Sequence, residues 1–479
     1  MLRSGRLHIS CSSFRSVASF TLDAVRVVPS WQNLFSCSVR LAMIAILAVA
    51  ILTIAPLGSI AKTIDLAVQR DSLDNGLQIL LLREPAVPAV SYYTCYKVGS
   101  RNERPGITGI SHFVEHMMFN GAKRYGPKEF DEILESNGGT SNASTSNDIT
   151  FYFEDIPSDK LELSIDLDSD RMENLAFEPS SLEAELGVVR EERRVGTDND
   201  VAGKMEEELY AAAFRASPYQ WPVVGWMGDL MRITRQDAIE YFKTYCVPNN
   251  ATIVVVGDFD PTQTLQLIRK YYADIPPGPP IGEPVDSEEE QIGERRIKVE
   301  KEAQLPAVMV GYHVPSVESR DVFALDVLQT ILTKGESSRL YRRLIDEEQM
   351  ALSVSSSYGW SIDPGLFYFH VEMKPGRKPE EAEVVLYQEL EKLSKEPVSQ
   401  KELRRAKNML KTGFLRWLKT DNDKANAIGV FEIVFGDWKK LGTIIESYEN
   451  ISAQDIQRVV EKHFGEKNRT VVTLVPLAY

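Results

Sequence analysis

The amino-acid sequence repeats at an offset of 218 residues, and this repeat limits the possible folds more than any other feature of the chain. Three pairs of segments match at that offset: 88–90 with 306–308 (PAV and PAV), 233–237 with 451–455 (ITRQD and ISAQD), and 250–254 with 468–472 (NATIV and NRTVV). Matches that lie far apart but share one offset predict a duplicated chain whose two halves have the same fold.

The repeat and the composition between its halves predict four segments. A chain of 479 residues is too long for one hydrophobic core. The stretch IPPGPP at 275–280 and the acidic run at 288–290 are typical of an exposed linker. We therefore expect a targeting segment at 1–61, an N-terminal domain at 62–274, a linker at 275–293 and a homologous C-terminal domain at 294–479.

Hydrophobic periodicity predicts an α+β fold in both halves, with helices packed on one face of a mostly antiparallel sheet. In the first half we expect strands at 77–82, 90–98, 144–153 and 252–256, and helices at 108–120, 128–136, 158–174, 237–245 and after a capping box formed by Ser180 and Glu183. The second half repeats this pattern with elements at 307–311, 322–332, 366–373, 380–393, 401–420, 455–463 and 471–475.

The charge and the cysteines exclude several classes of protein. With 54 Lys and Arg against 69 Asp and Glu, the formal net charge is −15, which disfavours nucleic acid as a partner. The chain has four cysteines and no C-x-x-C pair, so neither a disulfide framework nor a thiolate zinc site is expected. Cys95 and Cys246 are predicted to be free, buried thiols.

The first 61 residues are predicted to direct the chain across a membrane. Residues 41–55 are apolar, and the PLGSIA stretch at 56–61 ends in a small-x-small pattern, which together predict a secretory signal cleaved near Ala61 and a periplasmic protein. An uncleaved anchor spanning 41–61 is the alternative, and it would be the chain's one link to a membrane. The Ser- and Arg-rich composition of the first 40 residues is also typical of a mitochondrial transit peptide. A further alternative is that the start of the protein was assigned upstream of the true one at Met43.

Two of the six histidines lie four residues apart in the motif His112-Phe-Val-Glu115-His116. On a helix these two imidazoles and the carboxylate share one face. Neutral imidazoles are good zinc ligands, a catalytic zinc needs a third protein ligand beside an open position, and a nearby carboxylate can act as a base. The order H-x-x-E-H is the inverted form of a zinc-protease motif. A helix that happens to carry two histidines is the alternative, which the intervening Glu115 disfavours.

A third ligand is expected from the acidic helix that follows Ser180. It offers Glu183, Glu185, Glu191 and Glu192. Glu185 and Glu192 are seven residues apart and so share a helical face, whereas Glu191 points away. An ordinary solvated acidic helix has the same composition, so the pattern alone does not select a ligand.

Three motifs give the chain a recognisable likeness. GSRNE at 99–103, GISHFVEHMMF at 109–119 and VVREERR at 188–194 resemble the inverzincin family of pitrilysin, insulin-degrading enzyme and mitochondrial processing peptidase. The resemblance covers the whole mature chain and is strongest to the short bacterial branch, in which two two-domain chains form a clamshell. It implies one Zn²⁺ per chain, with Glu192, about 76 residues after His116, as third ligand and Glu185 as the group that orients a ligand.

The resemblance also implies a substrate-binding strand. The family pattern G-x-x-N-A-x-T matches residues 139–145, so Asn142 and Ala143 are expected to pair with the backbone of a peptide substrate.

One part of the second half departs from the family pattern. Active members usually carry an Arg and, seven residues later, a Tyr, where this chain has Ile345 and Leu352. The metal motif is absent there as well, because the repeat offset places Thr330, Thr333 and Lys334 at its three positions. The departure implies a heterodimer in which a homologous sister subunit supplies the Arg and Tyr. A homodimer or a monomer, with Arg343 or Tyr358 as substitute, is the alternative.

These features together predict a zinc endopeptidase that hydrolyses extended peptides inside a chamber, with Glu115 as general base. An inactive scaffold or assembly subunit of the same fold is the main alternative, although such chains lose the metal-binding face that this chain keeps. A zinc-storage module has little support, since two histidines in an α+β repeat do not make a sequestering site.

Overall fold

The computed structural model describes residues 64–282, 284 and 288–477. The predicted targeting segment at 1–61 lies outside these residues, so its fate stays a prediction. Within the described part of the chain, no helix is both long enough and apolar enough to cross a bilayer.

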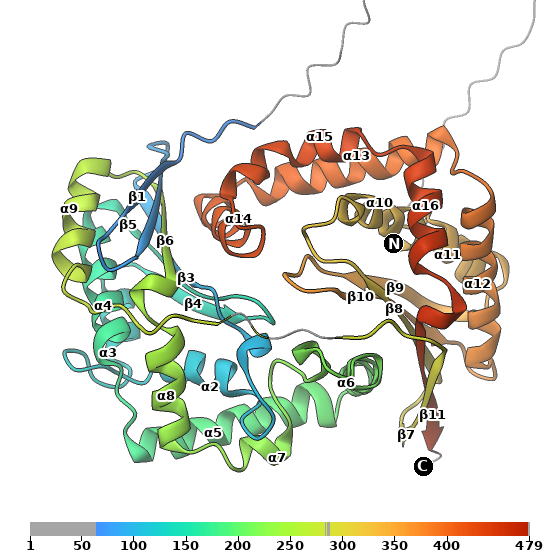
Figure 1. The fold of residues 1–479 in the computed structure, drawn as a ribbon, viewed down its shortest axis with the longest axis horizontal. Helices are drawn as coiled ribbons and strands as arrows, with labels where there is room; N and C mark the ends of the chain where they lie inside the picture. Colours follow the sequence, from blue (N-terminus) through green and yellow to red (C-terminus); the bar gives the residue numbers. More distant parts are fainter. Residues whose placement is uncertain (1–63, 283, 285–287, 478–479) are drawn as a thin grey trace, which may run out of the picture. The chain divides into compact units, whose positions relative to one another are not determined.

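The first half forms a six-stranded sheet (Figure 1). Its strands are β1 (Gln69–Ser72), β2 (Gln78–Arg83), β3 (Ala89–Tyr96), β4 (Thr140–Thr145), β5 (Thr150–Pro157) and β6 (Ala251–Gly257). Their order is β1-β2-β6-β3-β5-β4, and every pair except β2–β6 is antiparallel. Among the described strands, β4 therefore ends the sheet, and one of its edges is unpaired.

The second half forms a five-stranded sheet with the same connections. Its strands are β7 (Arg295–Glu302), β8 (Ala307–Val314), β9 (Ala351–Tyr358), β10 (Gly365–Met373) and β11 (Arg469–Leu477). The order β7-β11-β8-β10-β9 reproduces β2-β6-β3-β5-β4, and the single parallel pair, β7–β11, corresponds to β2–β6. The predicted duplication is confirmed, with β1 as an additional edge strand.

Most helices of each half cover one face of that half's own sheet, as predicted. In the first half they are α2 (Ile110–Met117), α3 (Glu129–Ser136), α4 (Leu161–Asn174), α5 (Pro179–Arg193), α7 (Met227–Leu230), α8 (Arg235–Tyr245) and α9 (Pro261–Tyr272). In the second half they are α10 (Asp321–Thr333), α11 (Arg339–Tyr341), α12 (Pro379–Lys395), α13 (Gln400–Trp417), α15 (Ile444–Glu449) and α16 (Ala453–His463). Alternate strand residues such as Ile79 and Tyr92 are fully buried beneath the first set.

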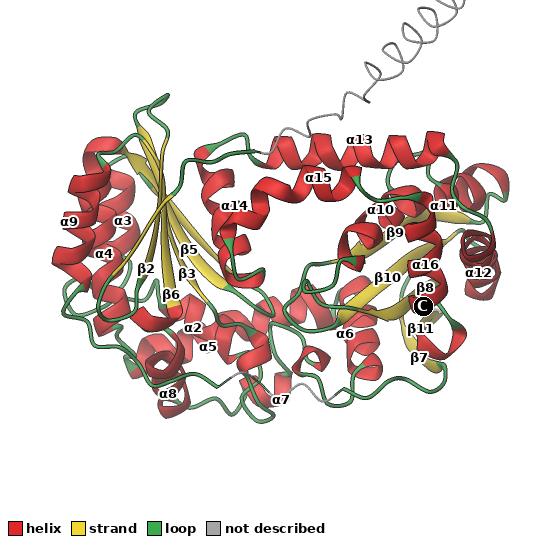
Figure 2. Cartoon of the chain, turned by 45° about the horizontal axis from the view of Figure 1, so that its top comes forward, coloured by secondary structure: helices red, strands yellow, loops and turns green. Residues whose placement is uncertain are grey.

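Each half also contributes one helix to the other half's sheet. Helix α6 (Val201–Ala213) packs on β7, β8 and β11, and helix α14 (Asp421–Val434) packs on β3 and β6. Figure 2 shows α14 on the face of the first sheet opposite α3, α4 and α9. Glycines allow both close approaches: a β-carbon at Gly311 would lie 3.1 Å from Leu209, and one at Gly429 would lie 2.6 Å from the Cys95 sulfur. Cys95 and Cys246 are free and buried, as predicted.

Three local predictions are wrong. The strand expected at 144–153 is the end of β4, a turn and the start of β5, because alternation continues across the turn. Helix α5 begins at Pro179, whose fixed φ suits a first helical position, so the Ser180 capping box does not form. The motif helix begins at Ile110 after Gly109, and Thr108 does not cap it.

Candidate metal centre

The position of helix α2 is fixed at its amino end by a glycine and a buried carboxylate. Gly109 has φ 87°, and a β-carbon there would lie 2.4 Å from the Val224 carbonyl oxygen, so a side chain cannot be accommodated. The Glu103 carboxylate accepts hydrogen bonds of 2.8 Å from the backbone N–H groups of Gly109 and Ser111. Burial raises the pKa of Glu103 to about 8, although these two bonds oppose the rise. The helix that carries the motif is thereby tied to the GSRNE segment.

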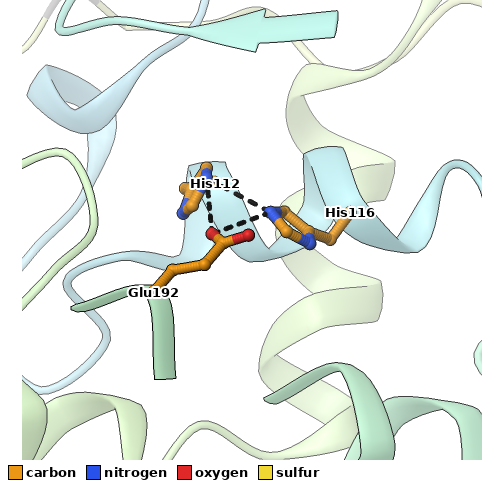
Figure 3. A group of neighbouring side chains, drawn as sticks. All are labelled: His112, His116 and Glu192. Atoms are coloured by element: carbon orange, nitrogen blue, oxygen red, sulfur yellow. Dashed lines mark hydrogen bonds and ion pairs between the residues drawn. The ribbon is translucent and has the colours of Figure 1, made fainter. Parts of the chain in front are cut away.

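Three side chains from α2 and α5 converge at one point (Figure 3). One ligand atom each from His112, His116 and Glu192 lie within 4.8 Å of one another. The two Nε2 atoms are 3.2 Å apart, and Glu192 Oε2 is 3.4 Å from Nε2 of His116 and 3.7 Å from Nε2 of His112. This set of two nitrogens and one carboxylate oxygen is chemically suited to Zn²⁺.

The protonation of His112 also suits a metal site. Burial, and to a smaller extent the neighbouring His116, lowers the pKa of His112 to about 4. The imidazole is therefore neutral near pH 7, which is the form that binds metals.

Glu185 orients His116 from the side opposite the convergent atoms. Its Oε1 is 2.8 Å from His116 Nδ1, and its Oε2 accepts a hydrogen bond of 3.0 Å from Asn120. Burial alone would lower the pKa of His116, but the hydrogen bond with Glu185 and the charge of Glu192 outweigh it and raise the pKa. With Nδ1 held by a carboxylate, the Nε2 lone pair is directed toward Glu192.

The other two carboxylates of the acidic helix do not reach the histidines. Glu183 forms an ion pair with Arg190, and Glu191 forms one with Arg194. Glu185 and Glu192 thus contact the histidines of α2, whereas Glu191 contacts Arg194.

Glu115 lies beside this point, between α2 and the edge strand β4. Its side chain is 9% exposed, and Oε2 accepts a hydrogen bond from the Thr145 hydroxyl at the end of β4. Burial raises the pKa of Glu115, while the Thr145 bond opposes the rise. A carboxylate with a raised pKa next to a metal-binding set is a candidate general base.

Strand β4 brings Asn142 and Ala143 to the unpaired edge next to Glu115. The strand pairs with β5 on one side, where Asn142 lies opposite Phe153 and Ala143 opposite Tyr152. The Ala143 N–H donates to the Asn142 side chain at 2.8 Å instead of to another strand. The Ala143 N–H group therefore lies on the unpaired edge of β4, where an added peptide strand would form its hydrogen bonds.

Two groups that shape the site, Arg193 and Thr145, were missed from the sequence. Arg193, the residue after Glu192, is buried, and its Nη1 lies 2.6 Å from Glu207 of α6 and 2.8 Å from the Gly225 carbonyl oxygen. Thr145 could have been identified from the sequence, because it is the last residue of the G-x-x-N-A-x-T motif at 139–145. Arg193 gave no comparable signal, since its partner is fixed by the packing of α6.

The second half has no equivalent cluster. Among the described residues, the group around His112 is the only set of three potential metal ligands. Ile345 lies in a π-helical turn at Arg342–Glu347, and Leu352 is 48% exposed on β9. Arg343 is paired with Glu389 at 2.8 Å, and the Tyr358 hydroxyl is buried without a hydrogen-bond partner.

Comparisons with known proteins agree with this geometry. A family model described as "Insulinase (Peptidase family M16)" matches residues 78–225, and one described as "Peptidase M16 inactive domain" matches residues 232–410. The zinc protease PqqE of Helicobacter pylori is 32% identical over 409 residues, which are 85% of this chain and 92% of that protein. The chain belongs to peptidase family M16. The resemblance stated from the motifs is therefore confirmed.

Solved M16 structures share the whole two-sheet arrangement. A protease from Helicobacter pylori superposes with a TM-score of 0.82 at 32% identity, covering 86% of this chain and 100% of that one. The periplasmic protease PqqL of Escherichia coli has a TM-score of 0.70 at 19% identity and covers 86% of this chain and 48% of that one, a likeness that shows the fold alone. Relatives of this chain in Helicobacter pylori and Mycobacterium leprae are named zinc proteases, which makes this chain a member of a protease family.

Proposed function

We propose that this chain is a zinc-dependent endopeptidase that holds one Zn²⁺ through His112, His116 and Glu192 and hydrolyses extended peptides. The observation that carries the proposal is the convergence of these three side chains within 4.8 Å, with the Glu115 carboxylate beside them. Zn²⁺ bound there would polarise a carbonyl and lower the pKa of a water molecule.

The chain's own residues perform the proton transfers. Glu115 accepts the proton of the attacking water and later passes it to the leaving amine. Its burial favours both steps, because a carboxylate with a raised pKa is a stronger base and its protonated form is populated nearer neutral pH. The Thr145 hydroxyl holds one carboxylate oxygen in place, so that Glu115 needs little reorganisation during the reaction.

The free edge of β4 holds the substrate. An extended peptide adds to β4 as a further strand, with Asn142 and Ala143 pairing with its backbone. Thr145 lies on the same strand and contacts Glu115, so a peptide bound along this edge passes next to the base. Backbone pairing places no demand on side chains, which supports a preference for extended, unfolded peptides.

The replacement Glu115→Gln tests this role. The variant keeps a hydrogen-bond acceptor for Thr145 but cannot take a proton, so we expect full zinc content and a loss of peptide hydrolysis of at least about 100-fold. Glu191→Gln, three residues from Arg194 on the exposed side of α5, is the matched control and should keep both properties. Near-normal turnover in Glu115→Gln would remove Glu115 as the base.

We further propose that the active enzyme is a heterodimer of this chain with a homologous sister chain. One donor aimed at the developing negative charge contributes about 2.7 to 4 kcal/mol, and Ile345 and Leu352 cannot donate. The two local substitutes are not available as donors either, since Arg343 is engaged by Glu389 and Tyr358 is buried. A sister chain that carries the Arg and Tyr would supply them, whereas a homodimer would repeat the deficit.

Activity of the purified chain alone, at full zinc occupancy, distinguishes these forms. We expect little turnover until the sister chain is added. Robust turnover of the isolated chain would refute the heterodimer and favour a homodimer or a monomer. Absence of both zinc and activity under all conditions would instead favour an inactive scaffold subunit.

A further inference from the structure

Helix α13 is strongly basic in an acidic protein. It has six cationic side chains and one carboxylate, whereas the whole chain has a formal net charge of −15. In the repeat α13 takes the place of α5, which has four carboxylates and two arginines. The duplicated helix has therefore lost the acidic residues of the metal site and gained positive charge.

Most of this charge has no carboxylate partner. In the described part of the chain, the ion pairs of α13 are Glu402 with Arg339 and Lys411 with Glu449. Arg405 bonds to the neutral Ser337 hydroxyl and the Thr330 carbonyl oxygen. The remaining cations of the helix thus leave an uncompensated positive potential at its surface.

Three of the unpaired cations, Lys401, Arg404 and Arg416, lie on an outward face together with apolar side chains. Spacings of three and four residues align Lys401, Arg404, Asn408, Thr412 and Leu415 on the helix, and all five are exposed. Arg416 follows Leu415, Lys419 lies two residues after the helix ends, and both are also exposed. The opposite face is buried through Leu403, Ala406 and Phe414. Beside the cations, Leu415 is 51% exposed and Met409 is 40% exposed. A helix that mixes exposed cations with exposed apolar residues is typical of a membrane-surface helix.

The described chain also begins on this side of the molecule. The Ile64 N–H donates to the Gly442 carbonyl oxygen at 3.3 Å, in the 3₁₀ turn Trp438–Thr443 that leads into α15. Helix α15 lies beside α13 in both ribbon views (Figures 1 and 2), and Lys411 binds Glu449 of α15 at 2.6 Å.

We propose that the outward face of α13, formed by Lys401, Arg404, Leu415 and Arg416, docks on an anionic lipid bilayer together with Lys419, which lies just beyond the end of the helix. The charge is complementary to anionic headgroups, and Leu415 and Met409 can enter the interface between the cations. An acidic protein surface is the alternative partner for this charge, and the vesicle test distinguishes it from a bilayer.

The test compares binding of the full chain to phosphatidylcholine vesicles with and without phosphatidylglycerol. Residues 1–40 carry five arginines and one aspartate and would also favour anionic vesicles, but they are the same in the wild type and in every variant. The comparison between the wild type and the variants therefore isolates the contribution of α13. We expect tighter binding to the anionic vesicles, which weakens with added salt. The variant with Lys401, Arg404, Arg416 and Lys419 changed to Gln should lose on the order of 600-fold of the preference for anionic vesicles, because each of the four basic residues contributes about fivefold.

A charge-matched control removes four exposed cations elsewhere, through Arg232→Gln, Lys243→Gln, Lys378→Gln and Lys467→Gln. It should retain most of the anionic-lipid dependence, and circular dichroism should show both variants folded. Equal binding to the two vesicle types would overturn the proposal and leave an acidic protein as the partner of this face. An equal loss in the control would overturn it as well, since it would show that net charge alone governs binding.

Discussion

Replacing Glu185 with Gln should weaken zinc binding while the fold stays intact. The structure holds His116 Nδ1 2.8 Å from the Glu185 carboxylate, whose side chain is 19% exposed. A hydrogen bond to a charged group is worth about 1.5 to 3 kcal/mol and a neutral one about 0.5 to 1.5 kcal/mol. Their difference of about 1 to 2 kcal/mol corresponds to roughly a tenfold loss in zinc affinity, at the lower end of the range for groups that orient metal ligands.

Competition with a chromophoric zinc chelator measures this loss. Glu183→Gln is the matched control, because Glu183 is on the same helix and 72% exposed, and its partner is Arg190 instead of a histidine. The control should bind zinc as the wild type does, whereas Glu185→Ala, which removes the acceptor completely, should bind more weakly than Glu185→Gln. Unchanged affinity in both Glu185 variants would refute the orienting role.

Two further predictions concern the amino terminus and the pH dependence of stability. Amino-terminal sequencing of the native protein should give a start near residue 62, and a start upstream of Leu41 would instead indicate an anchor. In the second half, burial raises the pKa of Asp326 to about 7, although Tyr448 and Trp360 donate hydrogen bonds to it. The folded chain therefore keeps a proton that the unfolded chain releases above the ordinary value of 3.8, so this group's contribution to the free energy of unfolding falls as the pH rises from about 4 to about 7. Asp326→Asn should flatten that fall in urea titrations at about pH 5 and about pH 8, and an unchanged slope would contradict the assignment.

Local patterns in the sequence were sufficient for the duplication and for the face of α2. His112, Glu115 and His116 share a helical face because of their spacing alone, and the seven-residue spacing of Glu185 and Glu192 brings both toward that face. Periodicity failed at the β4–β5 turn, where alternating residues continue through a change of strand.

Contacts between distant segments were beyond the sequence patterns. Nothing in the composition of α6 or α14 indicates that each packs on the sheet of the other half, since an apolar face does not specify which sheet covers it. The same holds for the Arg193–Glu207 ion pair, which depends on where α6 lies, and for the hydrogen bond between Thr145 and Glu115. The sequence was therefore sufficient to predict which side chains share the face of α2, but not the contacts from other elements that hold them in place.

The zinc content of Glu192→Gln, measured beside wild type and Glu191→Gln after dialysis, tests the metal centre most directly. Glu192 reaches both histidines, whereas Glu191 pairs with Arg194 on the neighbouring side of the same helix. The account predicts one zinc per chain in the wild type and in Glu191→Gln, and a clearly substoichiometric content in Glu192→Gln, because a neutral amide replaces the only carboxylate of the proposed ligand set. Full zinc occupancy in Glu192→Gln, or its loss in Glu191→Gln, would contradict the account.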